Sequence, residues 1–135
     1  MKNFCPCGSS KEYKRCCRIL HEGALPENPL QLMRSRYVAY VLQKAAYIIA
    51  TTHPLNPQYK KNIEEWTKEI LQFCKSARFK KLEIINFIDG EKEGYVTFTA
   101  HLEIDGQDAT FTEKSRFEKV DGRWLYLSGD ISGST

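Results

Sequence analysis

The sequence predicts an α+β fold, in which two or three helices pack on a curved, four-stranded antiparallel sheet beside a small N-terminal metal module. Apolar residues in the first half recur with the period of a helix, whereas the second half has the composition and turn signals of strands. Asp-Gly dipeptides divide this second half into consecutive hairpins. Four of the five cysteines lie between residues 5 and 17, in a segment with too few apolar side chains to fold without a cross-link.

The cysteine segment has the spacing C-x-C-x8-C-C, formed by Cys5, Cys7, Cys16 and Cys17. Four thiolates suit a structural Zn²⁺ ion, which takes soft sulfur ligands in a closed tetrahedral site. Disulfides are disfavoured because Cys16 and Cys17 are too cramped to bridge each other comfortably. His21 is an alternative to Cys17 as the fourth ligand, since imidazole is chemically acceptable to zinc. A site closed by four thiolates has no open position for catalysis at the metal.

The formal net charge of the chain lies on this segment. Residues 1–22 hold five basic and two acidic side chains, which gives +3, and the remaining chain holds 15 of each sign. The excess either provides an electrostatic handle for an acidic protein surface or a phosphate backbone, or simply solvates a small module.

We expect a linker after the cysteine segment, because Pro26, Asn28 and Pro29 interrupt regular structure there. We therefore expect two domains, a zinc-binding module over 1–25 and an α+β domain over 26–135. The larger domain begins with a helix from Leu30, where apolar residues recur at helical spacing to residue 41.

Two further helical segments are expected before the strands. Residues 45–52 continue the first helix or form a second one, which ends before His53 because a proline follows it. A third helix is expected over 58–77, with Trp66, Ile70 and Cys74 along one apolar stripe.

Four strands are expected over about 79–88, 94–104, 107–120 and 123–128. A two-residue turn at Asp105-Gly106 would pair Ile104 with Gln107 and Phe98 with Glu113. This register places Glu113 on the apolar face of the sheet, and a slip of one residue would turn it outward.

Composition agrees with an ordinary globular chain. Of 135 residues, 41% are hydrophobic and 27% are charged. The longest apolar runs, such as residues 45–50, fall well below the roughly 20 residues that a membrane helix needs. The first residues lack the apolar segment of a signal peptide, so we expect a cytoplasmic protein whose thiols stay reduced.

The cysteine segment resembles the SEC-C motif, the zinc element found at the C-terminus of the SecA translocation ATPase and in many unrelated bacterial proteins. The matching features are Cys5-Pro-Cys7-Gly-Ser, Tyr13-Lys-Arg-Cys16-Cys17 and His21. The resemblance implies that Cys5, Cys7, Cys16 and Cys17 bind the metal. The SEC-C element of SecA contacts the chaperone SecB and ribosomes through basic residues around the zinc. The resemblance implies that similar contacts are possible for this chain.

Residues 30–128 resemble the middle domain of the YchJ-like family, which has no established activity. The similar stretches are Leu32–Tyr40, Thr52–Pro54, Gly94–Phe98 and Glu113–Phe117. The resemblance implies a fold like that of nuclear transport factor 2 (NTF2-like, or cystatin-like), a cone of helices wrapped by a curved sheet.

Three polar residues are candidates for a pocket in this cone. Arg34 lies near the middle of the apolar stripe of the first helix, and Glu113 lies on the apolar face of the sheet. Because unpaired burial of either charge would cost several kcal/mol, we predict that they form an ion pair. This pair either fixes the helix on the sheet or lines a ligand pocket. His53 is a candidate acid or base there, or else a packing residue at a helix end.

These observations lead to three hypotheses of function. The first is a zinc-containing adaptor or binding protein, whose basic module docks on a protein, a ribosome or nucleic acid, and whose cone binds a ligand or a second copy of the chain. We expect no membrane partner. The second is a small-molecule enzyme of the lyase, isomerase or hydrolase kind, with Arg34, His53 and Glu113 in its pocket. A third possibility is that the zinc module only caps the larger domain.

Overall fold

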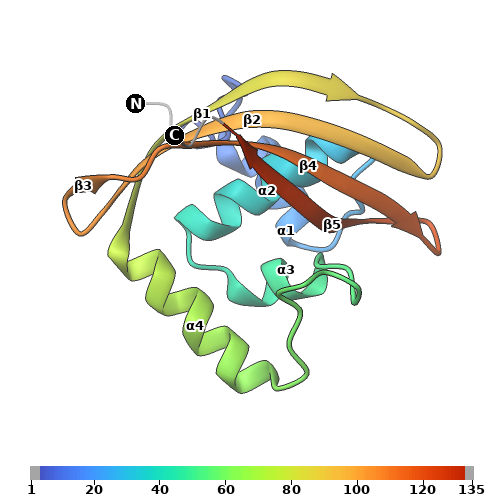
Figure 1. Cartoon of the computed structure of the whole chain (residues 1–135). Helices are drawn as coiled ribbons and strands as arrows, with labels where there is room; N and C mark the ends of the chain where they lie inside the picture. The colour runs from blue at the N-terminus through green and yellow to red at the C-terminus, as the bar shows by residue number, and fades with distance from the viewer. Residues whose placement is uncertain (1–3, 133–135) are drawn as a thin grey trace.

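The computed structural model describes residues 4–132 (Figure 1). A 3₁₀ turn at Tyr13–Arg15 precedes four helices, α1 (Cys17–His21), α2 (Pro29–Val41), α3 (Ala45–Ala50) and α4 (Ile63–Ser76). The strands follow as β1 (Ala77–Ile88), β2 (Glu93–Ile104), β3 (Gln107–Asp108), β4 (Phe111–Val120) and β5 (Arg123–Ser132). The predicted α+β order, helices first and an antiparallel sheet after them, is confirmed.

The sheet has the order β1-β2-β4-β5, with β3 paired to the end of β2. The turn at Asp105-Gly106 has positive φ at both residues, and it pairs Ile104 with Gln107 as predicted. The third predicted strand is interrupted at residues 109–110, but its two parts keep one register. Phe98 therefore faces Glu113 across β2 and β4, as the turn requires.

The sheet is curved, and its concave face is apolar. Burial alternates along β2, with Val96, Phe98, Ala100 and Leu102 buried. Register shifts in β1 and between β4 and β5 add bulges, which bend strands and increase their twist.

Side-chain caps set two of the helix starts. The Asn28 side chain accepts a hydrogen bond from the amide of Gln31, and Pro29 occupies the first position of α2. Pro29 thus belongs to the helix and not to the linker. Helix α4 begins at Ile63, five residues later than predicted, because Asn62 caps it.

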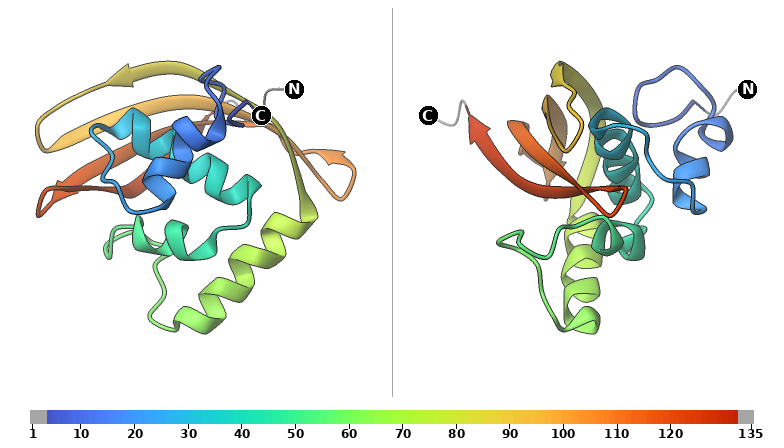
Figure 2. Two further views of the ribbon diagram at one scale, coloured as in Figure 1. Left: turned by 180° about the vertical axis from the view of Figure 1, so that it is seen from behind. Right: turned by 90° about the vertical axis from the view of Figure 1, so that its right-hand side faces the viewer.

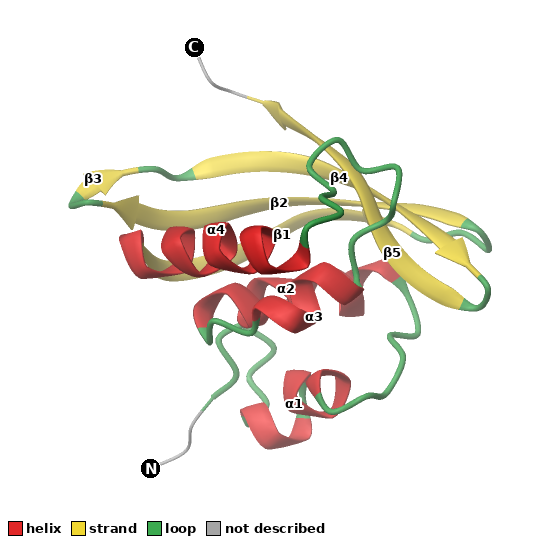
Figure 3. Cartoon of the chain, turned by 90° about the horizontal axis from the view of Figure 1, so that it is seen from below, coloured by secondary structure: helices red, strands yellow, loops and turns green. Residues whose placement is uncertain are grey.

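The cysteine segment packs on the side of α2 that faces away from most of the sheet, so α2 lies between them (Figures 2 and 3). A single buried core includes the cysteine segment, α2 and the sheet; its members include Cys5, Cys7, Cys17, Leu32, Val38, Leu82, Val96 and Phe117. Helix α2 is therefore buried on two sides, which is why it buries Ser35 and Arg36 as well as its apolar residues.

The segment after α3 closes one edge of the sheet. Thr52 forms a parallel bridge with Tyr126 of β5. The amide of His53 donates to the carbonyl of Tyr126, and the amide of Tyr126 donates to the carbonyl of Thr51, at 2.9 and 2.8 Å. None of the helices described within residues 4–132 is both long and apolar enough to cross a membrane.

Candidate functional site

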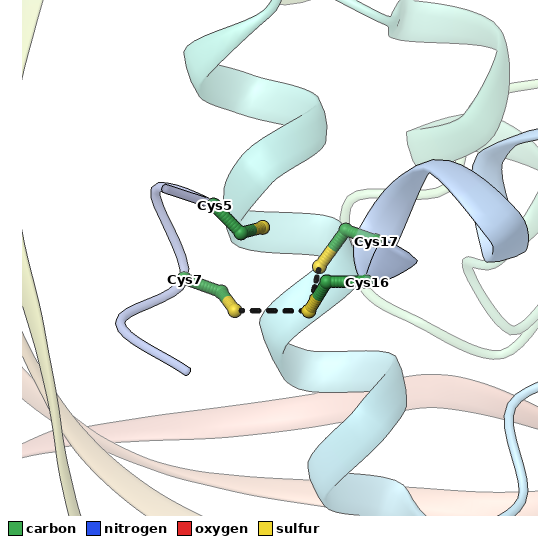
Figure 4. Close-up of side chains that lie close together, drawn as sticks. All are labelled: Cys5, Cys7, Cys16 and Cys17. Carbon is green, nitrogen blue, oxygen red and sulfur yellow. Dashed lines mark hydrogen bonds between the residues drawn. The ribbon is translucent and has the colours of Figure 1, made fainter. Parts of the chain in front are cut away.

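The structure brings together the four cysteines that the sequence selects as metal ligands (Figure 4). Their sulfur atoms all lie within 4.8 Å of one another. The Cys7 and Cys16 sulfurs are 3.6 Å apart, and those of Cys16 and Cys17 are 4.0 Å apart. A tetrahedral zinc ion with Zn–S bonds of ~2.3 Å places its ligands at the corners of a tetrahedron with edges of ~3.8 Å. The donor set therefore fits such an ion, and these separations are far longer than a disulfide bond of ~2.05 Å.

Local backbone contacts shape this cluster. The amide of Cys5 donates to the carbonyl of Lys11 at 2.7 Å, and the amide of Gly8 donates to the carbonyl of Cys5 at 3.2 Å. Gly8 has φ of +84°, which a residue without a Cβ adopts readily. The Ser9 hydroxyl lies 3.2 Å from the Cys16 sulfur. The turn between residues 5 and 12 thus aims the first two thiols at the start of α1.

Electrostatics within the cluster favour a bound cation. Hydrogen bonds from the thiols of Cys17 and Cys5 hold the pKa of Cys7 well below its ordinary value. Hydrogen bonding to Cys5 and Cys7, together with burial, raises the pKa of Cys17 well above its ordinary value. The thiols of Cys5, Cys7 and Cys17 therefore compete for protons, and a divalent ion would favour the thiolate form of its ligands.

His21, the alternative fourth ligand, makes hydrogen bonds that point away from the cysteine sulfurs. Its Nδ1 accepts a hydrogen bond from the Tyr13 hydroxyl at 2.8 Å, and its Nε2 donates to the carbonyl of Ser35 at 2.8 Å. Both ring nitrogens are thus engaged away from the sulfurs, and His21 does not replace Cys17 as a ligand. The Ser35 hydroxyl contacts the Tyr47 hydroxyl at 2.7 Å. These bonds link the cysteine segment through α2 to α3.

A cavity of about 980 Å³ lies on the concave side of the sheet, between α2, α4 and strands β2, β4 and β5. Nine of its lining residues are aromatic, and four carry charge, namely Arg36, Lys60, Glu69 and Glu113. Lys60 and Glu69 form an ion pair with each other at 2.5 Å.

Of the three predicted pocket residues, only Glu113 lines this cavity. Arg34 forms no ion pair within residues 4–132, and its buried Nε has no hydrogen-bond partner there, so the predicted pair with Glu113 is wrong. His53 is buried; its Nε2 lies 3.2 Å from Glu118, and its Nδ1 accepts from the amide of Leu55. His53 thus serves packing and turn formation.

The buried arginine of α2 is Arg36, which sequence reasoning missed. Its Nη1 donates to the carbonyl of Ile48 and to the hydroxyls of Thr51 and Thr52, at 2.9, 2.7 and 3.1 Å. Its guanidinium carbon lies 4.7 Å from the centroid of the Tyr126 ring. A signal was present in the sequence, because Met33, Arg36, Tyr37 and Tyr40 share the i, i+3, i+4, i+7 spacing of one helix face, and all four line the cavity.

Comparison with known proteins agrees with both parts of this architecture. Residues 28–129 match the family described as YchJ, middle NTF2-like domain. The chain belongs to this YchJ-like family. A UPF0225 protein of Vibrio parahaemolyticus is 41% identical over 132 residues, which cover 96% of this chain and 75% of that protein.

Two solved SEC-C motif containing proteins have similar structures. The solution structure of the protein RPA3114 from Rhodopseudomonas palustris has a TM-score of 0.81 and 29% identity, and the match covers 98% of this chain and all of that one (100%). The crystal structure of a protein from Psychrobacter arcticus has a TM-score of 0.77 and 25% identity, over 97% of this chain and 84% of that one. The YchJ-like chain described here therefore combines a SEC-C motif with an NTF2-like domain.

Proposed function

We propose that this YchJ-like protein is a zinc-binding adaptor. Cys5, Cys7, Cys16 and Cys17 hold a structural Zn²⁺ ion, and the face around it docks on an acidic surface of a protein partner. The zinc supplies a cross-link and no reactive position, because four thiolates complete its coordination.

The proposal rests on how the cysteine segment divides its side chains between core and solvent. Three of its four cysteines are buried in the shared core. All four of its described basic side chains, Lys11, Lys14, Arg15 and Arg18, are exposed. Lys14 and Arg18 lie 3.8 and 3.0 Å from Glu12 and Glu22. Within the described part of the chain, Lys11 and Arg15 have no carboxylate within 4.0 Å, and their charge is available to a partner.

Exposed apolar side chains accompany these charges. Phe4 and Ile19 are 59% and 50% exposed. Protein interfaces combine an apolar centre with a charged rim, whereas nucleic-acid binding relies on many phosphate contacts by basic residues. Two unpaired cations and two exposed apolar side chains in one short segment therefore favour an acidic protein over an RNA or DNA partner.

Site-specific photo-crosslinking in cells tests the docking face. A photoreactive residue replaces Ile19 in one variant and Ile63 in the other, because these isoleucines are matched in exposure at 50% and 49%. We expect a discrete protein adduct from position 19 that is absent from position 63. The adduct should be lost in K11E/R15E and retained in K68E/K75E, which makes the same change of charge on α4.

Two results would overturn this proposal. One is an adduct at position 19 that is indifferent to the charge of Lys11 and Arg15. The other is an adduct that disappears on nuclease treatment, which would assign the face to nucleic acid. The full chain is used throughout, because deleting the segment would remove Cys5, Cys7 and Cys17 from the core.

A further inference from the structure

Glu113 is a carboxylate on the apolar face of the sheet. It pairs with Phe98 on β2 and with Ile131 on β5, and it lines the cavity beneath them. Placing an ionised carboxylate among aromatic side chains is unfavourable unless hydrogen bonds or an opposite charge compensate for lost water. The groups around Glu113 therefore indicate which kind of partner its carboxylate binds.

Neighbouring groups hold the carboxylate in one orientation. The hydroxyls of Ser115 and Tyr126 both donate to Oε2 of Glu113, at 2.5 and 2.9 Å. Gly129 lies beside it on β5, and a Cβ there would overlap both the carboxylate and the Tyr126 hydroxyl. The other oxygen, Oε1, accepts no hydrogen bond from residues 4–132.

The two cations that line the cavity are already engaged elsewhere. Arg36 is only 7% exposed, and its Nη1 contacts the carbonyl and hydroxyls at the C-terminal end of α3. There it compensates the negative end of the helix, and the face of the Tyr126 ring covers its guanidinium. Lys60 pairs with Glu69. Arg36 and Glu113 are thus the two charged groups of the cavity without an ionic partner within 4.0 Å among the described residues. Arg36 is satisfied by three neutral acceptors, whereas Oε1 of Glu113 accepts from no described donor.

We propose that the cone cavity binds a small organic cation, a protonated amine on an apolar or aromatic body, with Glu113 Oε1 as its counter-ion. A carboxylate supplies the charge-assisted hydrogen bond that an ammonium group needs. Aromatic faces attract cations through their quadrupoles, and nine aromatic residues line this space. The volume of about 980 Å³ is at the upper end of the range for small-molecule sites.

A charge series of isosteric probes tests this inference on the intact, metal-loaded chain. Tryptamine, tryptophol and indole-3-propionate carry similar side chains on one indole ring and are cationic, neutral and anionic. We expect tryptamine to bind about 10- to 100-fold more tightly than tryptophol by calorimetry, the worth of one charge-assisted hydrogen bond. Indole-3-propionate should bind most weakly. In amide NMR spectra, the shifts should fall on cavity residues such as Ala100 and Gly129.

Matched variants identify the counter-ion. E113Q should bind tryptamine and tryptophol equally, whereas E83Q should keep the preference, because Glu83 pairs with His101 away from the cavity. Equal binding of the three probes by the unmodified chain, binding of none at millimolar concentration, or a preference for the anion would overturn the proposal. So would an amine preference that survives in E113Q. The series on the unmodified chain decides the question even where E113Q fails to fold.

Discussion

At the scale of single residues, the five cysteines divide into two environments. Four share one small volume at the N-terminus, and Cys74 lies alone on the buried side of α4. Burial raises the pKa of Cys74, which keeps it a thiol and suits a small core residue. Cysteine thus has two roles in this chain, as a candidate thiolate ligand at the N-terminus and as a neutral thiol in the core at position 74.

Replacing one cysteine from each environment separates these purposes. We expect Cys17→Ser to lose zinc, because a serine hydroxyl does not ionise and cannot replace a thiolate. Since even outer-shell partners of a metal site cost about 10–100-fold in affinity, loss of a ligand should cost at least that much. Cys74→Ser should retain one zinc per chain. Metal analysis of both purified proteins checks this, and equal zinc contents would contradict it.

The cysteine cluster could be predicted from sequence because it is local: one turn and the start of one short helix bring residues 5–17 together. Glu113 could be placed because a two-residue Asp-Gly turn fixes the register of the strands that follow it. Arg36 was missed because the predicted stripe ran through Leu30, Arg34 and Tyr37. The face that lines the cavity is instead formed by Met33, Arg36, Tyr37 and Tyr40, so the polar residue within it is Arg36 and not Arg34.

At the scale of elements, α2 connects the two candidate sites. One of its faces packs on the cysteine segment and receives the hydrogen bond from His21, and the other lines the cavity. Arg36 then ties α2 to the C-terminal end of α3, a six-residue helix that is too short to be stable alone. Arg36 therefore fixes the C-terminal end of α3, in addition to the contact between the Ser35 and Tyr47 hydroxyls.

Two arginines on α2 provide a matched test of this dependence. Arg36→Met should lower the free energy of unfolding by about 2–4 kcal/mol, because it removes a buried, charged donor from three acceptors. Arg34→Met should change it by less than about 1 kcal/mol, since the buried Nε of Arg34 has no partner within residues 4–132. Urea unfolding of both variants gives the comparison. A larger loss in the Arg34 variant would contradict the assignment.

The start of α4 shows how local hydrogen bonds override a helical sequence pattern. The helical pattern from residue 58 predicted a longer α4, but the Asn56 side chain accepts from the amide of Gln58 and holds a turn there. Asn62 then supplies the cap, so the helix starts at Ile63. Both asparagines are visible in the sequence; which of several possible caps is used depends on tertiary packing.

At the scale of the whole molecule, the cysteine segment and the NTF2-like domain share one core, whereas the sequence predicts two domains. Buried sulfurs contact the same cluster as Leu82 of the sheet, and a Cβ on Gly8 would lie 3.6 Å from the carbonyl of Leu82. A metal bound by the cysteines would therefore also stabilise the NTF2-like domain.

Chelation tests this coupling. Removing zinc should lower the melting temperature of the whole chain by about 10 °C or more in a single transition, since a structural zinc contributes several kcal/mol and each kcal/mol shifts a small domain by several degrees. Far-ultraviolet circular dichroism, which reports the helices and the sheet of the whole chain, should show that single transition, and the amide NMR signals of β2 and β4 should disappear over the same temperature range. A sheet that melts at an unchanged temperature would instead show an independent module.

The parts of the shared core are translated at different times. The four thiols are complete once residue 17 has been translated, and their short spacing lets an ion gather them long before the strands exist. Leu82 and Val96, which belong to the same buried cluster, are made much later. We therefore expect α2 to fold against a surface that the metal has already shaped, with the sheet closing last. If the proposed zinc is the metal, its supply during translation would determine how long four oxidisable thiols stay exposed to solvent.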